Sequence, residues 1–277
     1  MTDRPRKPAL AAFLTLLAPG LGQIYNGEWA KALVLLSVTI PLVIACVLLL
    51  FSPWFHFVLP LAIVAGLGLW VYAMYDALRT AERFSESYEL KPFNRVFVYV
   101  AIVLAFGITR GLFTELVRST FIQAFRIPSE AMMPTIVPGD YVFADRRPSA
   151  RTPRRGDLVV CATPENPRAQ FIKRVVGTAG DRIEIRDKTL FVNGHAQAEN
   201  YVIHIDPAIH QGPRDNMDAY VVPHGTYFVL GDNRDNSLDS RFFGPIEHID
   251  GTLRGIYWSW DPERHAVRWN RVGRLLE

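Results

Sequence analysis

The chain has 277 residues, 49% of them hydrophobic, and carries a formal net charge of +3. This length suits one sizeable domain joined to a membrane region, or two domains. The small net charge gives little support to a nucleic-acid partner. The two cysteines, Cys46 and Cys161, lie far apart in the chain, so no disulfide framework is expected. Apolar residues crowd into the first 117 positions and charged residues into the rest, which predicts a membrane part followed by a soluble part.

Three uncharged or nearly uncharged runs predict membrane helices. Residues 32–51 and 57–75 are each long enough to cross a bilayer, and the short link 52–56 makes them a hairpin. A third run, 96–117, contains Arg110, which we expect to lie near the outer interface. The alternative for each run is a buried helix of a soluble protein. The predicted domains are a membrane module over 1–90, an anchor helix over 91–118 and a β domain over 119–277.

The distribution of basic residues predicts the orientation of these helices. The N-terminus and the segment after the hairpin are basic, whereas the hairpin tip has no Lys or Arg. Because loops rich in Lys and Arg stay in the cytoplasm, both flanks are expected inside, and residues after about 118 outside. The basic residues concerned are Arg4, Arg6, Lys7, Arg79, Arg83, Lys91 and Arg95.

The first apolar stretch, 9–25, is interrupted by Pro19 and Gly20. Three arrangements are open: a re-entrant segment, an interfacial segment, or a single span that places the N-terminus outside. A cleaved signal peptide is disfavoured, because the apolar region runs directly into Pro-Gly and two further spans. Residues 19–27, Pro-Gly-Leu-Gly-Gln-Ile-Tyr-Asn-Gly, resemble a short motif of small bacterial membrane modules with paired helices, which implies no particular chemistry.

The pattern changes to short β-type runs after residue 135, separated by Gly, Pro, Asn and Asp. Asn193-Gly194 predicts a type I′ hairpin turn. We therefore expect a mainly antiparallel folded sheet or partly open barrel. The polar stretch from about 198 to 222 is expected to be an inserted irregular loop. The expected strands are 141–144, 158–161, 171–176, 182–185, 189–192, 227–230 and 256–260.

Three separated clusters in the polar half carry residue types suited to chemistry: 125–140, 171–181 and 231–244. The first follows the last membrane helix directly. In the second, Lys173 lies in an apolar strand, and an inward-facing lysine loses its proton more readily because burial disfavours the charged form. Each cluster alone has an ordinary interpretation: a Pro-Ser turn, a surface lysine, and a polar turn or calcium-like loop.

Taken together and in this order, the clusters resemble the boxes of type I signal peptidases, the bacterial leader peptidases of peptidase family S26. The matching residues are Ile-Pro-Ser-x-x-Met-x-Pro-Thr from Ile127, Gly139-Asp140, Arg155-Gly156-Asp157, Lys-Arg-Val-Val-Gly from Lys173, and Gly-Asp-Asn-x-x-x-Ser-x-Asp-Ser-Arg from Gly231. The resemblance covers about residues 110 to 260, and the last box is the most specific part of it.

The resemblance implies roles for individual residues in a Ser–Lys endopeptidase site. Lys173 corresponds to the general base, Ala131 to the position of the nucleophile, and Ser129 to a serine that binds the oxyanion. Ser237 would orient Lys173. The residues expected to support the site are Asp232, Asn233, Asp239 and Arg241, and Asp239 and Arg241 would form an ion pair. The residues expected to contact the substrate are Ile127, Met132 and Pro134. Phe125, Met132, Met133 and Ile136 would form an apolar skirt facing lipid or the cleavage pocket, or would belong to the core.

The chain departs from the family pattern at residue 131, which is alanine where the family has its nucleophilic serine. A methyl group cannot attack a carbonyl. Three interpretations remain open. The chain is an inactivated engineered form, or Ser129 replaces the missing nucleophile with Lys173, or the chain is a natural non-catalytic relative that binds preproteins or peptides.

The function implied by the resemblance is cleavage of signal peptides from exported preproteins at the bacterial cytoplasmic (inner) membrane, by a multi-pass protein whose catalytic-type domain is extracytoplasmic. The partners implied are membrane lipid and preproteins with small residues at the cleavage site. The substrate would bind extended along a strand edge. A membrane-anchored binding protein is the main rival, and a self-cleaving Ser–Lys protein a weaker one. No cofactor and no metal are expected, because no ligand cluster or phosphate loop is visible in the sequence.

Overall fold

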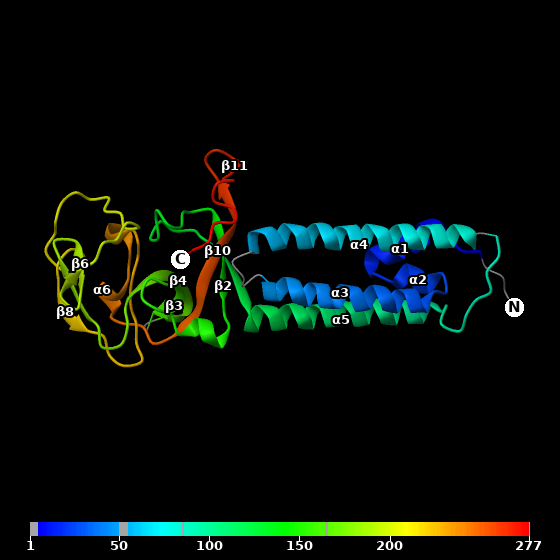
Figure 1. Cartoon of the computed structure of the whole chain (residues 1–277), viewed down its shortest axis with the longest axis horizontal. Helices are drawn as coiled ribbons and strands as arrows, with labels where there is room; N and C mark the ends of the chain where they lie inside the picture. The colour runs from blue at the N-terminus through cyan, green and yellow to red at the C-terminus, as the bar shows by residue number, and fades with distance from the viewer. Residues whose placement is uncertain (1–4, 50–54, 85, 164–165, 277) are drawn as a thin grey trace. The chain divides into compact units, whose positions relative to one another are not determined.

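The computed structural model describes residues 5–49, 55–84, 86–163 and 166–276. The chain divides into two compact units, residues 1–115 and residues 116–277. The first unit is helical and the second is built on β-strands (Figure 1). This division agrees with the fold class expected from the sequence: apolar helices followed by a mainly antiparallel β domain.

The apolar runs form helices that extend beyond their predicted bounds. Among the described residues, Pro60–Arg83 and Val96–Thr120 are long and apolar enough to cross a membrane. The end of the first predicted run and most of the predicted hairpin tip, residues 50–54, lie outside the described residues. The helices are α1 (Pro8–Leu17), α2 (Leu21–Tyr25), α3 (Trp29–Leu49), α4 (Phe55–Arg83) and α5 (Val96–Thr120).

The first apolar stretch folds back on itself as α1 and α2. Gly20, with φ of 90°, makes the turn between them. The ten residues of α1 rise only about 15 Å, half the hydrocarbon thickness of a bilayer. The Arg6 backbone N–H donates to the Phe84 carbonyl at 2.9 Å, and Trp70 Nε1 donates to the Thr15 carbonyl at 3.1 Å. Thus α1 runs antiparallel to the last turns of α4.

Residues 19–27 hold this helical turn against α4. Gln23 Nε2 donates to the Ala73 carbonyl at 2.7 Å, and Asn26 Nδ2 donates to the Ala77 carbonyl at 2.7 Å. Both amides are buried, and their N–H groups find acceptors on α4, whereas Gln23 Oε1 and Asn26 Oδ1 have no hydrogen-bond partner within the described residues. A Cβ at Gly22 would lie 2.3 Å from the Ala11 carbonyl oxygen and 2.9 Å from Ala77 Cβ. The motif therefore packs two short helices tightly onto a long one.

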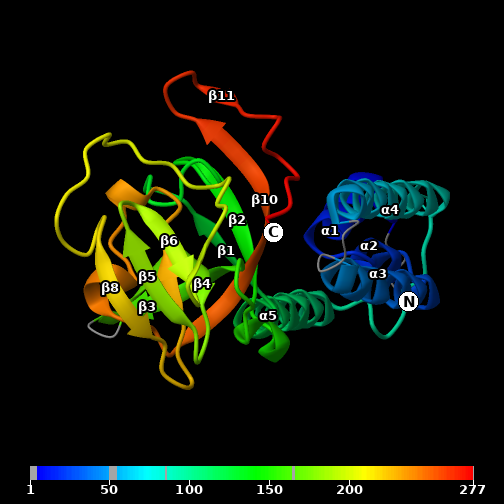
Figure 2. The same ribbon diagram turned by 60° about the vertical axis from the view of Figure 1, so that its left-hand side comes forward.

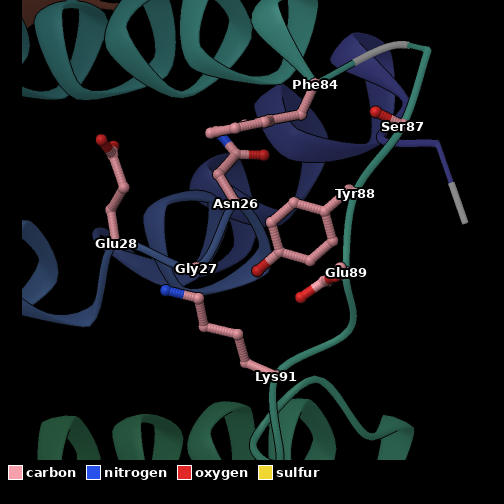
Figure 3. A pocket seen from close by; sticks show the side chains of 8 residues that line it. All are labelled: Asn26, Gly27, Glu28, Phe84, Ser87, Tyr88, Glu89 and Lys91. Atoms are coloured by element: carbon pink, nitrogen blue, oxygen red, sulfur yellow. The ribbon is translucent and has the colours of Figure 1, made fainter. Parts of the chain in front are cut away.

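The segment after α4 also folds onto this turn. Asn94 Nδ2 donates to the Ile24 carbonyl at 3.1 Å, and the Tyr88 hydroxyl donates to Asn94 Oδ1 at 2.9 Å. Figure 3 shows the Tyr88 ring pointing from this segment toward Asn26 and Gly27. These contacts fix the segment between α4 and α5, which the sequence had suggested only as a basic loop.

The second unit contains two antiparallel sheets. The larger one has the strand order β1-β2-β10-β3-β4-β9, with β11 paired to β10, and the smaller one has the order β7-β6-β5-β8. Among the described strands no pairing joins β1 to β9, so the larger sheet does not close into a barrel. The strands are β1 (Ile122–Arg126), β2 (Asp140–Asp145), β3 (Leu158–Thr163), β4 (Asn166–Gly177), β5 (Arg182–Arg186), β6 (Thr189–Val192), β7 (His195–Ala196), β8 (Met217–Val221), β9 (Phe228–Leu230), β10 (Ile249–Asp261) and β11 (Ala266–Val267).

Two expectations about this unit were incomplete. The stretch 198–222 is not wholly irregular, because it ends in β8, which pairs with β5. The last strand is longer than its predicted core, since β10 pairs along its length with both β2 and β3 (Figure 2). The predicted turn at Asn193-Gly194 is present: both residues have positive φ, 52° and 82°, and Val192 pairs with His195.

The core of the second unit joins the two sheets. One apolar cluster contains Val176 of β4 and Phe228 of β9 from the larger sheet, together with Ile183 and Leu190 from the smaller. A second cluster lies between β2, β3 and β10 and includes Ile127, Met132 and Ile136 from the segment after β1. A third contains Val159, Cys161 and Val175. Burial of these side chains anchors the segment 127–136 to the sheet.

The close approach at Gly22 gives a testable prediction for the first unit. Gly22→Ala should destabilise the α1–α2 turn by about 1–3 kcal/mol, because the added methyl group has no room beside α1 and α4. The measurement is the thermal midpoint of helix loss in the detergent-solubilised full chain. Gly66→Ala in α4 is the matched control, since nothing lies within 4 Å of a Cβ there. Equal midpoints for the two variants would contradict the packing described.

Candidate active site

Lys173 lies on the inner face of β4. It pairs with Val159 of β3, and its neighbours along the same face of β4 are Phe171 and Val175. The side chain is only 3% exposed, so the interpretation as a surface lysine does not hold. Its Nζ donates a hydrogen bond of 2.8 Å to the Ser237 hydroxyl. The second and third sequence clusters therefore meet at this amine.

The surroundings of Lys173 favour the neutral amine. Burial lowers the pKa of Lys173 below its ordinary value, and the nearby cation Arg241 acts in the same direction, while Asp239 opposes both. The neighbouring Cys161 is affected in the opposite sense: burial raises the pKa of its thiol to about 12. The amine is thus the basic group of this face, and the cysteine remains a protonated thiol.

Gly231 brings the first cluster to the same place. A Cβ built on Gly231 would lie 2.2 Å from Ser237 Oγ and 2.6 Å from the carbonyl oxygen of Ala131. Ser237 and the backbone of Ala131 therefore border one carbon-sized space that only glycine leaves free. The Asn233 backbone N–H donates to the Ala131 carbonyl at 3.1 Å, and Asn233 Nδ2 donates to the Glu130 carbonyl at 3.3 Å. Residue 131 is held by the same loop that carries the hydrogen-bond partner of Lys173.

The loop 231–241 is cross-linked by buried charge. Arg241 and Asp239 form an ion pair with an N–O distance of 2.8 Å, and both side chains are almost fully buried. Asp239 also accepts from the Gly231 backbone N–H at 3.0 Å. Arg241 Nη2 donates to the Arg234 carbonyl at 2.7 Å, and Arg234 Nε donates to the Gly231 carbonyl at 3.1 Å. The ends of the loop are therefore tied together on either side of Ser237.

A second buried ion pair lies beside the first, and the sequence did not single it out. Arg174 and Asp232 are 2.8 Å apart, with side chains 4% and 1% exposed. The Thr135 hydroxyl donates to Asp232 at 2.5 Å, so this pair also holds the first cluster. The Arg174 guanidinium lies 3.9 Å from the centroid of the Tyr201 ring. The available signal was the position of Arg174 directly after Lys173, because adjacent strand residues face opposite sides and an inward-facing Lys173 places Arg174 on the other face of β4.

The C-terminal segment supports the first cluster from the other side. Arg271 Nη2 donates to Asp140 at 2.6 Å and to the Thr135 carbonyl at 2.9 Å. The Ser259 hydroxyl donates to Asp140 at 2.6 Å. Asp140 belonged to a predicted box, whereas Arg271 was not recognised, because only the folded chain brings it near. The segment 127–140 is thus fixed by both buried charges and core packing.

The remaining predicted residues differ in exposure. Ser129 and Pro134 are exposed, which leaves them accessible to a peptide. Ile127 and Met132 are 6% and 3% exposed and lie in the core cluster with Ile136. The expectation of a lipid-facing skirt is therefore wrong for Met132 and Ile136, because buried side chains present no surface to lipid. Their core position was the alternative weighed from the sequence.

The comparisons with known proteins agree with this arrangement of boxes. The family model described as signal peptidase, peptidase S26, matches residues 95–258. Signal peptidase I of Pseudomonas fluorescens is 33% identical over 215 residues, which cover 59% of this chain and 75% of the relative. Thylakoidal processing peptidase 1, chloroplastic, of Arabidopsis thaliana is 38% identical over 162 residues, 54% of this chain and 45% of that protein.

Among solved structures, a crystal structure of a signal peptidase I from Enterococcus faecalis V583 is 32% identical, covers 38% of this chain and 98% of that chain, and has a TM-score of 0.31. The family match starts at Arg95 and ends at Trp258, and so includes α5 and the three clusters that meet around Lys173. Because the match spans more than half of the sequence, the chain belongs to the signal peptidase family, peptidase S26.

Proposed function

We propose that this chain carries a Ser–Lys site of the signal peptidase type, in which Lys173 is the general base and residue 131 occupies the nucleophile position. The observation that carries the proposal is the buried Lys173 amine donating to Ser237 next to the backbone of Ala131. The reaction is hydrolysis of the peptide bond between a signal peptide and the exported protein. In this chain residue 131 has no hydroxyl, so the proposed site lacks its nucleophile.

With a serine at 131, the chemistry follows from the charges of the site. The neutral Lys173 amine takes the proton from the serine hydroxyl as its oxygen attacks the scissile carbonyl. The Ser129 hydroxyl and a backbone N–H stabilise the oxyanion. The resulting ammonium donates its proton to the departing amine, and water then hydrolyses the acyl-enzyme with Lys173 again acting as base. Ser237 orients Lys173 by accepting its hydrogen bond throughout.

The supporting residues position rather than react. Asp239 and Arg241 hold the loop that carries Ser237, and Asp232 and Asn233 hold the segment that carries residue 131. We propose that the exposed Pro134 contacts small substrate side chains and that Ile127 and Met132 support this contact from the core beneath the segment.

The substrates and the location follow from the helices. We propose that α3, α4 and α5 anchor the protein in the bacterial cytoplasmic membrane as a multi-pass protein, with the basic segments inside and the second unit outside. The apolar composition of α4 and α5 supports this placement. A preprotein held in the same membrane by its signal peptide would meet the site at a raised effective concentration.

The alanine at position 131 gives two alternatives to this peptidase: a different nucleophile, or a protein that binds preproteins without cleaving them. Ser129 is exposed and lies just before the turn that contains residue 131, so it would have to take the place of residue 131 beside Lys173. A non-catalytic protein that only binds preproteins needs no hydroxyl at 131. The intact support around Lys173 favours the peptidase over the binding protein, because binding alone has no use for a desolvated base.

The first prediction concerns residue 131. Ala131→Ser should raise the rate of preprotein cleavage by at least about 10³-fold over the original chain, because it supplies the only missing reacting group. The measurement is single-turnover cleavage of a preprotein by each purified chain in detergent. Ser129→Ala in the original chain is the control for a substitute nucleophile. If both 131 variants bind the preprotein and neither cleaves it, the binding protein is the correct interpretation.

The second prediction concerns the base. In the Ala131→Ser chain, the cleavage rate should rise with pH through the lowered pKa of Lys173, since only the neutral amine accepts a proton. Ser237→Ala in that background should cost about 10- to 100-fold in kcat, because the amine loses its hydrogen-bond acceptor. Lys173→Met should abolish cleavage. Ser149→Ala, on a surface turn outside the three clusters, is the control, and a pH profile without this rise would contradict the role of Lys173.

A further inference from the structure

The first unit contains a groove of about 800 Å³ that none of the peptidase chemistry uses. Leu10, Leu14 and Leu17 of α1 line one side, and Val100, Val103 and Leu104 of α5 line the other. Leu14 and Leu17 lie four and seven residues after Leu10, and Val103 and Leu104 lie three and four residues after Val100, so each set lies on one helix face. The family match begins at Arg95, so the α1 side of the groove lies outside it. The walls suit a hydrocarbon chain.

One end of the groove is polar. Arg6 and Lys7, just before α1, and Asn94, just before α5, line it. Asn94 Nδ2 donates to the Tyr99 hydroxyl at 2.8 Å, and the Lys7 backbone N–H donates to the Tyr25 hydroxyl at 3.1 Å. Both helices start at this end and run away from it along the apolar walls. The groove is therefore amphiphilic, with its cationic residues at one end.

Arg6 is an unusual residue at this end. Its guanidinium carbon lies 4.3 Å from the Tyr25 ring centroid and 3.9 Å from the Tyr88 ring centroid, and the residue is 6% exposed. Figure 3 shows that Tyr88 comes from the segment between α4 and α5. Within the described part of the chain, Arg6 Nε and Nη2 have no hydrogen-bond partner, and no carboxylate forms an ion pair with Arg6. A buried cation with two unpaired donors is costly unless an anion joins it.

The two unpaired nitrogens form the fork that arginine uses to bind an oxyanion with two parallel hydrogen bonds. The guanidinium lies against the rings of Tyr25 and Tyr88, and Arg6 is one of the residues that line the groove. The apolar walls begin beside this fork. The ten residues of α1 rise about 15 Å, which matches the hydrocarbon depth of one bilayer leaflet. An anionic headgroup at Arg6 would place its acyl chain along Leu10, Leu14 and Leu17.

We propose that this groove binds one anionic phospholipid, with the headgroup phosphate at Arg6 and Lys7 and an acyl chain between α1 and α5. The inference rests on the proposed membrane placement, in which the polar end faces the cytoplasmic leaflet, and is independent of residue 131. Free inorganic phosphate shares the headgroup chemistry but gains nothing from the apolar walls. The apolar walls therefore favour a phospholipid, whose acyl chain they can bury, over free phosphate.

The test is native mass spectrometry of the full chain in micelles supplied with phosphatidylglycerol, or with phosphatidylcholine as the zwitterionic lipid. The original chain should retain phosphatidylglycerol, and Arg6→Gln should bind it at least about tenfold more weakly. Arg79→Gln is the matched control, because Arg79 is also an arginine beside a tyrosine ring, that of Tyr75, but lies outside the groove. Arg6→Lys should show intermediate binding, since it keeps the charge and loses the fork.

A second variant separates the lipid from free phosphate and from misfolding. Val103→Trp fills the apolar part of the groove and leaves Arg6 in place, so it should also weaken phosphatidylglycerol binding about tenfold. Thermal unfolding of each variant without added lipid identifies any that has lost its fold, and the remaining ones decide the question. Equal binding to Arg6→Gln and Arg79→Gln, equal retention of both lipids, or displacement of the lipid by inorganic phosphate alone would overturn the proposal.

Discussion

The candidate site depends on one interaction, the hydrogen bond from the buried Lys173 amine to Ser237. An ammonium deprived of water is costly, and one hydroxyl acceptor does not replace a hydration shell. The apolar face of β4, shared with Phe171 and Val175, therefore lowers the pKa of Lys173 and makes the amine available as a base. The same burial removes the freedom of the side chain. Basicity and orientation thus have a common cause, which is the placement of this lysine on the core side of a strand.

The buried ion pairs around this amine serve geometry more than stability. Replacing such pairs by apolar residues is often neutral for stability, whereas their directional hydrogen bonds select one arrangement of the backbone. Asp239 ties Arg241 to the Gly231 N–H, and Asp232 ties Arg174 to Thr135. Together these contacts fix the backbone on both sides of Ser237 and at residue 131. As a result the backbone of Gly231 lies so close to Ser237 and to residue 131 that any side chain at position 231 would displace one of them.

Local pattern predicted β2 to β6, β9, β10, the Asn193-Gly194 turn and the order of apolar helices before strands, because each depends on neighbouring residues. It missed β1, β7, β8 and β11. In β8 only Met217 is partly buried, so the strand lacks the alternation that marks a half-buried strand. The three clusters could be listed from the sequence, but their support could not. Arg271 and Thr135 meet across 136 residues, and no spacing rule connects them. The fold of residues 9–25 was left open because it depends on the bonds from the Gln23 and Asn26 amides to backbone carbonyls of α4, about 50 residues further along the chain.

Each unit buries a cation, and the difference between the two residue types explains their different consequences. Burial lowers the pKa of Lys173, so this amine releases its proton more readily, and this makes it chemically useful. A guanidinium keeps its charge in proteins, so Arg6 cannot do the same. The rings of Tyr25 and Tyr88 offset part of the cost through their negative faces but supply no acceptor for the N–H groups. A buried lysine can therefore act as a base without any further partner, whereas a buried arginine with unpaired N–H donors needs a bound anion to accept their hydrogen bonds.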